Sequence, residues 1–377
     1  MAIQRLPASL IPLDAALAAL LERVKPVGPI ELPLAEALGC VAADVPPPKA
    51  RPPCDVAVRD GWALASGDLV GASSYSPLPL SAAPRWVDAG EALPSGCDCV
   101  VDADCVDQAG PAFQVVAEAR PGEGVRRKGE DIAEGSSLGD FISGRWIRPL
   151  DLLLARLAGF DRLRVRRPRL RIIDIPASSG EMATAQLITE TARAAGTHTI
   201  CARAAGRDRQ SVASALESGD CDMLITIGGS GVGRNDATIT ALASRGEVIA
   251  HGIALEPGRT AAIGKIENVP VIALPGAPDA ALAAWWALAL PSLDRLAWLW
   301  PRDRLTLPLE RKIASSVGIA EIVLLKHLEQ SWIPLAVGDL SLATIARADA
   351  FFVVPGGSEG FAAGTLVEAY ELRHQPM

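Results

Sequence analysis

Apolar residues recur along this 377-residue chain with different periods before and after about residue 165. In residues 12–24 the leucines and a valine lie three or four positions apart, which predicts an amphipathic helix. The same spacing predicts a second helix over residues 148–160. Short apolar runs between turns predict strands in the segment that separates these helices. Those runs are residues 85–90, 97–106 and 112–119.

Beyond residue 165 the pattern changes to strands that alternate with helices. A basic linker leads into a predicted strand at residues 170–175. The elements expected after it are a helix at 184–195, a strand at 197–202, a helix at 210–218, a strand at 223–227, a helix after Asp236, strands at 247–255 and 269–276, and a helix from Ala280. Such alternation is typical of a parallel sheet with helices on both faces, which binds ligands at the carboxyl ends of its strands.

After residue 300 strand patterns dominate again, in residues 304–313, 320–328, 350–357 and 365–372. We therefore predict a multidomain chain of the α+β and α/β classes. Its expected parts are an N-terminal mixed α/β region with a helical linker and a β-rich insertion (1–165), a central three-layer α/β/α domain (166–300) and a small β-barrel-like domain (301–377).

Composition narrows the classes of function. Apolar residues make up 49% of the chain, enough for large cores. The net charge is −8 and aromatics are 4%, which argues against nucleic acid or an anionic membrane as the main partner. No run of 18 charge-free apolar residues predicts a membrane span. Of seven cysteines, Cys97, Cys99 and Cys105 cluster without a common zinc spacing, so we expect thiols in a reducing, cytoplasmic location.

The stretch LITIGGSGVGRND, residues 224–236, carries the strongest chemical signal. A predicted strand runs into four glycines over six positions, and Asp236 follows them ahead of a helix. Glycine lets backbone N–H groups approach an anion, and a helix N-terminus adds a favourable dipole. The spacing fits neither a Walker loop nor the dinucleotide fingerprint. We predict a phosphate-type site here; the alternative is a tight turn with Asp236 as a helix cap.

Four further stretches are candidates for chemistry. LEPGRTAAIGK (255–265) and ALPGAPDAAL (273–282) each place Pro-Gly after a strand, which indicates two rigid loops lining one cleft, or two ordinary turns. CDVAVRDGWAL (54–64) and VRRKGEDIAEG (125–135) place carboxylates beside basic residues, an arrangement that suits Mg²⁺ or is surface charge alternation. None of the four histidines has a Ser or Cys nucleophile motif around it, and His251 is predicted to be structural.

Together these motifs resemble the molybdopterin molybdenumtransferase family, of the MoeA type that also forms the C-terminal domain of gephyrin. The similarity runs in order from about Pro12 to the C-terminus. The motifs that carry it are LPLAEALGCVAADV, DVAVRDGWAL, LPSGCDCVV, RRKGEDIAEG, LITIGGSGVGRND, LEPGRTAAIG and LPGAPDAAL. The resemblance implies a central molybdopterin-binding domain, and insertion of molybdenum into molybdopterin from its adenylylated form and molybdate, with Mg²⁺ and release of AMP. It also implies a homodimer whose cleft lies between the central domain of one subunit and the N-terminal part of the other.

Carried over residue by residue, the resemblance gives Asp60, Asp131 and Asp236 catalytic roles. Asp236 and, by a looser alignment, Asp208 become the candidate Mg²⁺ ligands. The candidate substrate-binding residues are Gly228, Gly229, Gly231, Gly233, Pro257, Gly258, Arg259, Pro275, Gly276 and Pro278. Expected partners are the pterin substrate, a second copy of the chain, and molybdoenzymes or other proteins of cofactor synthesis.

The chain also departs from the family pattern. The family's Thr-Gly-Asp-Glu-Leu motif is missing, with Glu181 the nearest replacement, and its loop serine is Gly231. A family lysine is Glu256, and an asparagine is Ala277. Molybdate is a dianion, and one unit charge pair at about 4 Å is worth about 4 kcal/mol at an effective dielectric near 20. Three hypotheses therefore stay open: an active transferase, an impaired paralogue that binds or delivers molybdopterin or acts as a scaffold, and another nucleotide-dependent transferase on the same fold.

Overall fold

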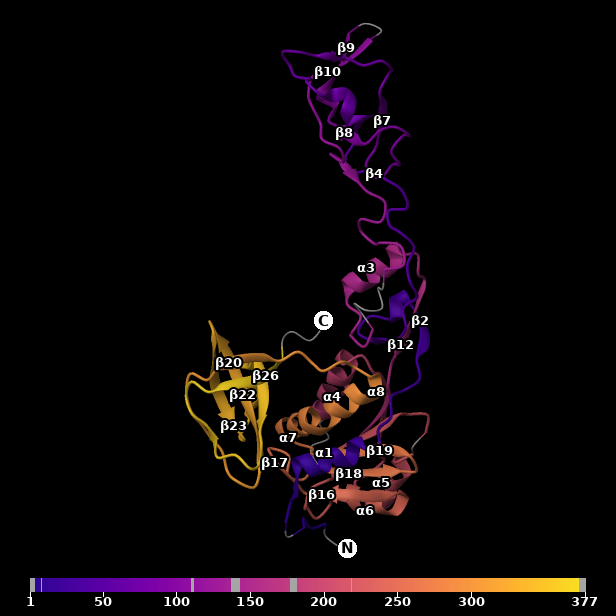
Figure 1. Ribbon diagram of the computed structural model, residues 1–377. Helices are drawn as coiled ribbons and strands as arrows, with labels where there is room; N and C mark the ends of the chain where they lie inside the picture. The colour runs from indigo at the N-terminus through magenta and orange to yellow at the C-terminus, as the bar shows by residue number, and fades with distance from the viewer. Residues whose placement is uncertain are drawn as a thin grey trace. The chain divides into compact units, whose positions relative to one another are not determined.

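The computed structural model describes residues 4–7, 9–109, 112–136, 143–176, 182–217 and 219–372. The chain forms two compact units, which are described separately (Figure 1). The core unit comprises residues 1–43, 143–149 and 163–377, and the inserted unit comprises 44–142 and 150–162. Contacts between residues divide the chain into these two units rather than at residues 165 and 300. The predicted domain boundaries stay predictions.

The core unit contains a six-stranded sheet of order β14-β13-β15-β19-β18-β16. Its bounds are β13 Arg169–Asp174, β14 His198–Arg203, β15 Met223–Ile227, β16 Glu247–His251, β18 Ala262–Ile266 and β19 Val269–Leu274. The pairs β14-β13, β13-β15 and β15-β19 are parallel, as the alternating pattern predicts, whereas β18 and β16 pair antiparallel. The sheet is therefore mixed, and β18 was not predicted.

The single strand predicted over residues 247–255 is two strands in the structure. Gly252 has a φ of 83° and divides it into β16 and β17 (Ile253–Glu256), which belong to different sheets. Glycine adopts this left-handed conformation without the steric cost that a side chain would carry. The break matters for the site because β16 ends beside the Gly-rich loop and β17 leads into the LEPGR loop.

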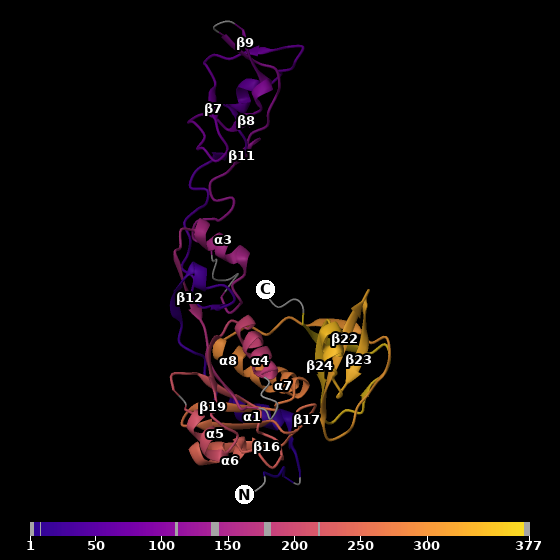
Figure 2. The ribbon, with the colours of Figure 1, turned by 180° about the vertical axis from the view of Figure 1, so that it is seen from behind.

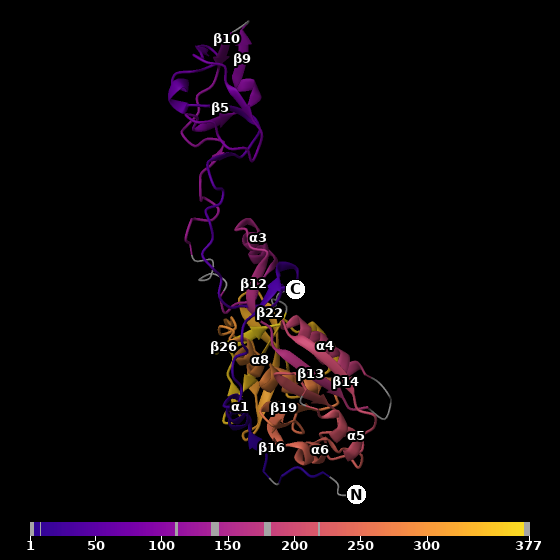
Figure 3. The same cartoon turned by 90° about the vertical axis from the view of Figure 1, so that its right-hand side faces the viewer.

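Helices cover both faces of the central sheet. Because side chains alternate along a strand, Ile172, Ile225 and Ile272 join one core cluster, while their neighbours Ile173, Leu224 and Val271 join another. The first cluster includes α1, α4, α7 and α8, and the second includes α5 and α6. Figures 2 and 3 show α5 and α6 together on one side of the strands. Their bounds are α1 Leu13–Leu21, α4 Ala183–Ala194, α5 Arg209–Ala215, α6 Thr238–Arg245, α7 Pro278–Ala284 and α8 Leu290–Ala297, with a π-helical turn at Trp285–Ala289.

A second sheet of the core unit has the order β1-β17-β22-β24-β26-β20, with β23 paired to β22. Its bounds are β1 Ile11–Pro12, β20 Leu305–Pro308, β22 Ala320–Leu328, β23 Ser331–Val337, β24 Ala350–Val354 and β26 Leu366–Glu371. Each of the four strands predicted after residue 300 contains one of these strands. The sheet also takes β1 and β17 from earlier in the chain. The remaining elements here are β21 Ile313–Ala314, which pairs with β25 Gly360–Phe361, and α9 Leu342–Arg347.

The inserted unit is built mainly from short strands. They are β4 Val56–Ala57, β5 Gly61–Leu64, β6 Leu78–Pro79, β7 Arg85–Val87, β8 Cys99–Val101, β9 Val106–Ala109, β10 Ala112–Val115 and β11 Val125–Arg126. A Cβ on Gly61 would lie 2.2 Å from the Val101 carbonyl oxygen, so this close pairing of β5 with β8 requires glycine. Helix α3 (Pro149–Leu157) lies within the helix predicted over residues 148–160. The spacing predicts Leu152, Leu153, Leu157 and Phe160 on its inward face, but the helix buries Leu152 and exposes Leu153 and Leu157.

A small sheet of β2 (Ile30–Pro33), β12 (Arg162–Arg166) and β3 (Val41–Ala42) completes the strands. Short 3₁₀ turns lie at Leu34–Glu36, Ser66–Leu69 and Ala103–Cys105. In the part of the chain that the structure describes, no helix is both long and apolar enough to cross a membrane.

Candidate functional site

A cavity of about 380 Å³ opens at the carboxyl ends of three parallel strands of the core unit. Loops that follow β13, β15 and β19 form its walls, which is where sheets of this kind bind ligands. The cavity-lining residues are Asp174, Ile175, Pro176, Thr184, Ala185, Arg207, Ile227, Gly228, Gly229, Ser230, Gly231, Asp236, Thr260, Pro275, Gly276, Ala277 and Ala280. The structure thus brings together the Gly-rich loop and the LPGAP loop, as the sequence predicts.

The backbone of the Gly-rich loop is anchored through its carbonyl groups. Every carbonyl of residues 228–231 accepts a hydrogen bond, from Thr238, Gln4 or His251, at distances of 2.7 to 3.1 Å. In a trans peptide the N–H group points opposite to the carbonyl. The N–H groups of residues 229–232 therefore point away from these donors, and they have no acceptor among the described residues. Successive backbone N–H groups that are free of protein acceptors are the donors from which anion-binding concavities are built.

Two glycines are required for this loop conformation. Gly228 and Gly229 have φ angles of 93° and 67°, in the left-handed region that side chains disfavour. A Cβ on Gly229 would also lie 2.4 Å from Thr238 Oγ1. Thr238 Oγ1 in turn donates to the Gly228 carbonyl, so a side chain at 229 would break an anchor of the loop.

Asp236 lies at the rim of the loop and its carboxylate is held at both oxygens. Arg207 Nη2 donates to Oδ1 at 2.8 Å, and Gly233 N donates to Oδ2 at 3.0 Å. A Cβ on Gly231 would lie 2.6 Å from Oδ2, so the glycine leaves room for this carboxylate. Helix α6 has Ala237 as its N-cap and no side-chain cap, so the alternative of Asp236 as a helix cap is wrong.

The predicted contribution of the α6 N-terminus is corrected by the structure. The first N–H groups of α6 bond within the protein: Thr238 N donates to Gly229 O, and the N–H groups of Ile239 and Thr240 donate to Gln4 Oε1. These N–H groups are therefore occupied, and an anion in the cavity would accept hydrogen bonds from N–H groups of the loop rather than from those of α6.

Sequence reasoning missed Asp174, Arg207 and Ser230. Asp174 ends β13 and is buried, with Oδ2 3.2 Å from Arg203 Nε; burial raises its pKa, against the lowering effect of Arg203. The run RIIDIP, a strand that ends on a carboxylate at the ligand-binding edge, is the signal that could have found it. Ser230 is 1% exposed, and its hydroxyl has no hydrogen-bond partner among the described residues. A buried hydroxyl without a partner on a cavity wall is poised to bind a ligand.

The LEPGR loop contributes less than predicted. Thr260 lines the cavity, whereas Pro257, Gly258 and Arg259 are not among its lining residues. Arg259 Nε instead donates to the Glu256 carboxylate. The negative charge that distinguishes Glu256 from the family lysine is therefore compensated locally.

In the LPGAP loop, Pro275 and Gly276 line the cavity, as predicted. The Gly276 carbonyl accepts a hydrogen bond from Thr184 Oγ1 at 2.8 Å, which ties this loop to α4. Pro278 is the first residue of α7, where a missing N–H group costs no helical hydrogen bond. Its place in the structure is that of a helix start rather than a cavity wall.

Asp208 caps α5 and does not line the cavity. Its Oδ1 accepts hydrogen bonds from the N–H groups of Gln210 and Ser211 at 3.0 Å, and Oδ2 accepts one from the Ser211 hydroxyl. These bonds to Ser211 hold the pKa of Asp208 below its ordinary value. A metal role for Asp208 stays a prediction.

Two further predicted carboxylates, Asp60 and Asp131, belong to the inserted unit. Asp60 Oδ1 accepts a hydrogen bond from Ala89 N at 2.7 Å, and Asp131 lies 3.5 Å from Arg126 Nη1. Glu181, the suggested replacement for the missing acidic motif, lies outside the described residues. The functional roles of Asp60 and Asp131 stay predictions.

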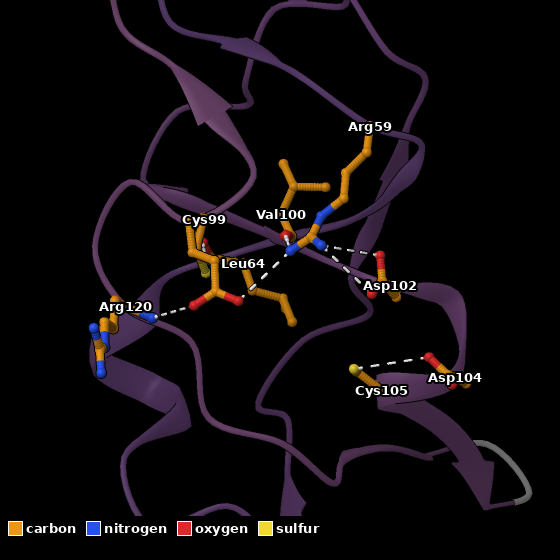
Figure 4. A network of polar contacts seen from close by, with 9 residues as sticks. Arg59, Leu64, Cys99, Val100, Asp102, Asp104, Cys105 and Arg120 are labelled. Atoms are coloured by element: carbon orange, nitrogen blue, oxygen red, sulfur yellow. Dashed lines mark hydrogen bonds and ion pairs between the residues drawn. The ribbon is translucent and has the colours of Figure 1, made fainter.

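Arg59, which precedes Asp60, is engaged inside the inserted unit. Figure 4 shows its guanidinium directed at Asp102 and at the Val100 carbonyl, with which Nη2 makes a 3.1 Å hydrogen bond. Nη2 also lies 3.6 Å from Glu123 Oε1. The basic residue of the RDGW motif therefore stabilises its own unit.

The oxygen donors of the cavity suit a hard cation shared with a ligand. No group of three or more His, Cys, Asp or Glu side chains is placed to hold a metal within the described residues. Asp174 and Asp236 nevertheless bring two carboxylates to one cavity, beside the loop N–H groups. Mg²⁺ is usually held by one or two carboxylates together with substrate phosphates and water. The donor set therefore fits Mg²⁺ bound together with a phosphate ligand.

Comparison with known proteins gives consistent matches over most of the chain. Residues 11–159 match the family described as "MoeA N-terminal region (domain I and II)", and residues 178–295 match the "Probable molybdopterin binding domain". The chain is 26% identical over 401 residues to molybdopterin molybdenumtransferase 2 of Mycobacterium tuberculosis, covering 93% of this chain and 97% of that protein. It is 26% identical to the molybdopterin molybdenumtransferase of Synechococcus elongatus, covering 88% and 91%. The crystal structure of the MoeA molybdopterin biosynthesis protein from Pyrococcus horikosii matches with a TM-score of 0.71 at 26% identity, covering 96% and 99%.

Proposed function

The chain belongs to the MoeA family of molybdopterin molybdenumtransferases, and from this premise we propose that it inserts molybdenum into adenylylated molybdopterin and releases AMP. The observation that carries the proposal is the set of N–H groups of residues 229–232, which have no acceptor among the described residues. They lie in a loop that lines a cavity at the strand ends, together with the carboxylates of Asp174 and Asp236. Such a set of N–H groups suits a phosphate group, and the carboxylates suit the cation that accompanies it.

In this proposal the Gly-rich loop binds the terminal phosphate of the pterin. The loop N–H groups and the Ser230 hydroxyl donate hydrogen bonds to phosphate oxygens. Arg207, which lines the cavity and pairs with Asp236, adds positive charge. Pro275 and Gly276 line the same cavity. Asp236 and Asp174 would hold Mg²⁺, which supplies positive charge against the phosphate oxygens.

Two features favour active transfer despite the departures from the family pattern. Glu256 is paired with Arg259, so its charge is compensated. Ser230 places a buried hydroxyl, which has no hydrogen-bond partner in the part of the chain that the structure describes, directly before Gly231, where the family has its serine. A hydroxyl donor for an oxyanion is therefore present one position earlier in the loop.

A second candidate, a relative that binds or delivers molybdopterin without transfer, is favoured by one observation. The LEPGR loop has Glu256 where the family has a lysine, and its basic residue is Arg259. Arg259 donates to the Glu256 carboxylate and is not among the residues that line the cavity. Such a protein would bind the pterin phosphate and fail to bind molybdate.

Family resemblance carries the rest of the proposal. By that resemblance Asp60 and Asp131 act in catalysis, the protein is a homodimer, and its protein partners are molybdoenzymes or other proteins of cofactor synthesis. A cytoplasmic location agrees with the seven cysteines, all of which carry free thiols.

The test is transfer by purified protein supplied with adenylylated molybdopterin, Mg²⁺ and molybdate. We expect molybdate-dependent AMP release and metal incorporation, both lost in Asp236→Asn. Asp220→Asn is the matched control. Asp220 is an exposed acid that precedes the N-terminal end of β15, whereas the cavity lies at the carboxyl end of that strand. Tight pterin binding without molybdate-dependent turnover would leave the carrier as the better description. Absence of pterin binding would reject both candidates.

A further inference from the structure

We propose that Gln4, in the segment that precedes β1, is a positioning residue that holds the Gly-rich loop in its anion-binding conformation. The ligand in this inference is the phosphate group of the proposed function. Gln4 is 5% exposed, and the hydrogen bonds that its side chain makes within the described residues all go to the loop and to α6. It lies 225 residues from Gly229 in the sequence, so nothing in the loop motif itself predicts the contact.

The carboxamide of Gln4 uses both of its functional ends. Nε2 donates to the carbonyls of Gly229 and Gly231 at 3.1 and 2.7 Å. Oε1 accepts from the N–H groups of Ile239 and Thr240 at 2.8 and 3.3 Å. Only a primary amide of this length offers two donors and an acceptor together. Gln4 therefore connects the loop directly to the first turn of α6.

The two carbonyls that Gln4 anchors decide the direction of two N–H groups. Fixing the Gly229 carbonyl turns the N–H of Ser230 the opposite way, and fixing the Gly231 carbonyl does the same for Val232. Glycine at 229 and 231 makes rotation of these peptides easy, because it adopts conformations that other residues avoid. The Gly229 carbonyl also accepts from Thr238 N, whereas Gln4 is the only donor to the Gly231 carbonyl among the described residues. Without Gln4, a rotated Gly231–Val232 peptide would present a carbonyl oxygen where an anion needs a donor.

The segment that carries Gln4 is itself fixed to the core unit. Ile11 pairs with Ile253 in the parallel β1-β17 pair, and Ile11 N donates to the Gly252 carbonyl at 2.9 Å. A Cβ on Gly252 would lie 2.9 Å from Pro7 Cδ and 3.1 Å from Leu6 Cδ2, so glycine there makes room for the segment. Little further ordering of Gln4 is therefore needed when a ligand binds.

The test compares Gln4→Glu and Gln4→Met with wild type in the full chain. Glu keeps the acceptor but loses both donors, and Met keeps the length without either function. Arg5→Ala is the matched control, since Arg5 is exposed in the same segment. The first probe is inorganic phosphate, whose binding is monitored by NMR of the backbone amides of residues 229–232. The second probe is adenylylated molybdopterin.

We expect both Gln4 variants to keep the circular dichroism of wild type and to weaken phosphate binding by about tenfold or more, equivalent to about 1.4 kcal/mol. The KM for the pterin should rise by a similar factor while kcat changes less. A general loss of structure would instead lower the unfolding temperature and the apparent kcat, because fewer molecules are active, and would leave KM unchanged. Wild-type phosphate affinity in both folded variants overturns the inference.

The two proposals fail in different ways. If wild type binds phosphate at residues 229–232 but does not bind or turn over the pterin, the proposed function fails and the phosphate affinities of the Gln4 variants still decide the inference. If wild type shows no phosphate shift at these amides, the loop is not an anion site and the inference is overturned as well.

Discussion

Single residues of the Gly-rich loop have separable tasks. Gly229 supplies a backbone conformation and clearance from Thr238, whereas Gly231 supplies space for the Asp236 carboxylate. Gly231 has no positive φ, so a larger residue at this position is excluded by the Asp236 carboxylate rather than by the backbone conformation. The departure of Gly231 from the family's serine is thus linked to where Asp236 lies. We therefore expect that serine at position 231 displaces the Asp236 carboxylate, and that this loss outweighs the gain of a hydroxyl.

We predict that Gly231→Ser lowers molybdate-dependent AMP release several-fold. A Cβ at 231 would lie 2.6 Å from Asp236 Oδ2, so the carboxylate must move and its contacts with Arg207 and Gly233 weaken. The assay is the transfer reaction at saturating pterin, with Gly231→Ala as the control that adds the Cβ alone. Equal losses in both variants identify displacement of Asp236 as the cause. A gain of activity in Gly231→Ser alone would show that the missing hydroxyl had limited the enzyme.

At this scale the sequence predicts the glycines and Asp236 but not their partners. The glycines are recognisable because they are close together after an apolar strand. Gln4 and His251 are not, because each meets the loop only through the packing of distant segments. A glutamine near the start of a chain carries no local sign that its amide will be buried.

At the scale of elements, the carboxyl ends of β13, β15 and β19 set the cavity, and β16 supports it from the side. His251 ends β16, and its Nε2 is 2.9 Å from the Ser230 carbonyl oxygen. Burial lowers the pKa of His251 below its ordinary 6.5, with the Ser230 contact acting in the opposite direction. The neutral ring that remains at neutral pH donates through Nε2–H to the loop. The prediction of a structural role for His251 extends to anchoring that loop.

The depressed pKa gives a pH dependence of defined sign. The unfolded chain takes up a proton at His251 near pH 6.5, before the folded protein does, so this contribution to stability is present above 6.5 and is lost as the pH falls through the folded pKa. We expect the free energy of unfolding in urea to fall between about pH 7.5 and about pH 5.5 more in wild type than in His251→Gln. Gln keeps a donor for the Ser230 carbonyl and does not titrate. Parallel pH profiles for the two proteins would contradict the assignment.

Most elements were predictable because their apolar periods are regular, and the errors have physical causes. The strand expected over 247–255 is broken by Gly252, whose left-handed φ a periodicity argument does not see. Strand β18 was missed because Gly264 looks like part of a loop. In the structure a Cβ on Gly264 would lie 2.4 Å from the Glu247 carbonyl oxygen, so this glycine permits close strand pairing rather than a turn.

At the scale of the whole molecule, the predicted catalytic carboxylates belong to two units. Asp236 lies in the core unit, whereas Asp60 and Asp131 lie in the inserted unit. Short-range sequence patterns identify each unit's residues without relating the units to each other. The family resemblance alone relates them, through a cleft shared by two subunits. That relation is a statement about assembly and is tested by mixing subunits.

We predict that Asp60→Ala and Asp236→Ala, each inactive alone, regain activity when the two proteins are unfolded, mixed in equal amounts and refolded together. In a mixed dimer one cleft pairs the intact Asp236 of one subunit with the intact Asp60 of the other, and the second cleft lacks both. Random assortment makes half of the dimers mixed, so about a quarter of wild-type AMP release is expected for a twofold-symmetric dimer. Mixing Asp236→Ala with Asp236→Asn is the control, since no combination restores that carboxylate. If both aspartates act within one subunit, the mixture stays inactive, and the shared cleft is rejected while the anion-binding loop is unaffected.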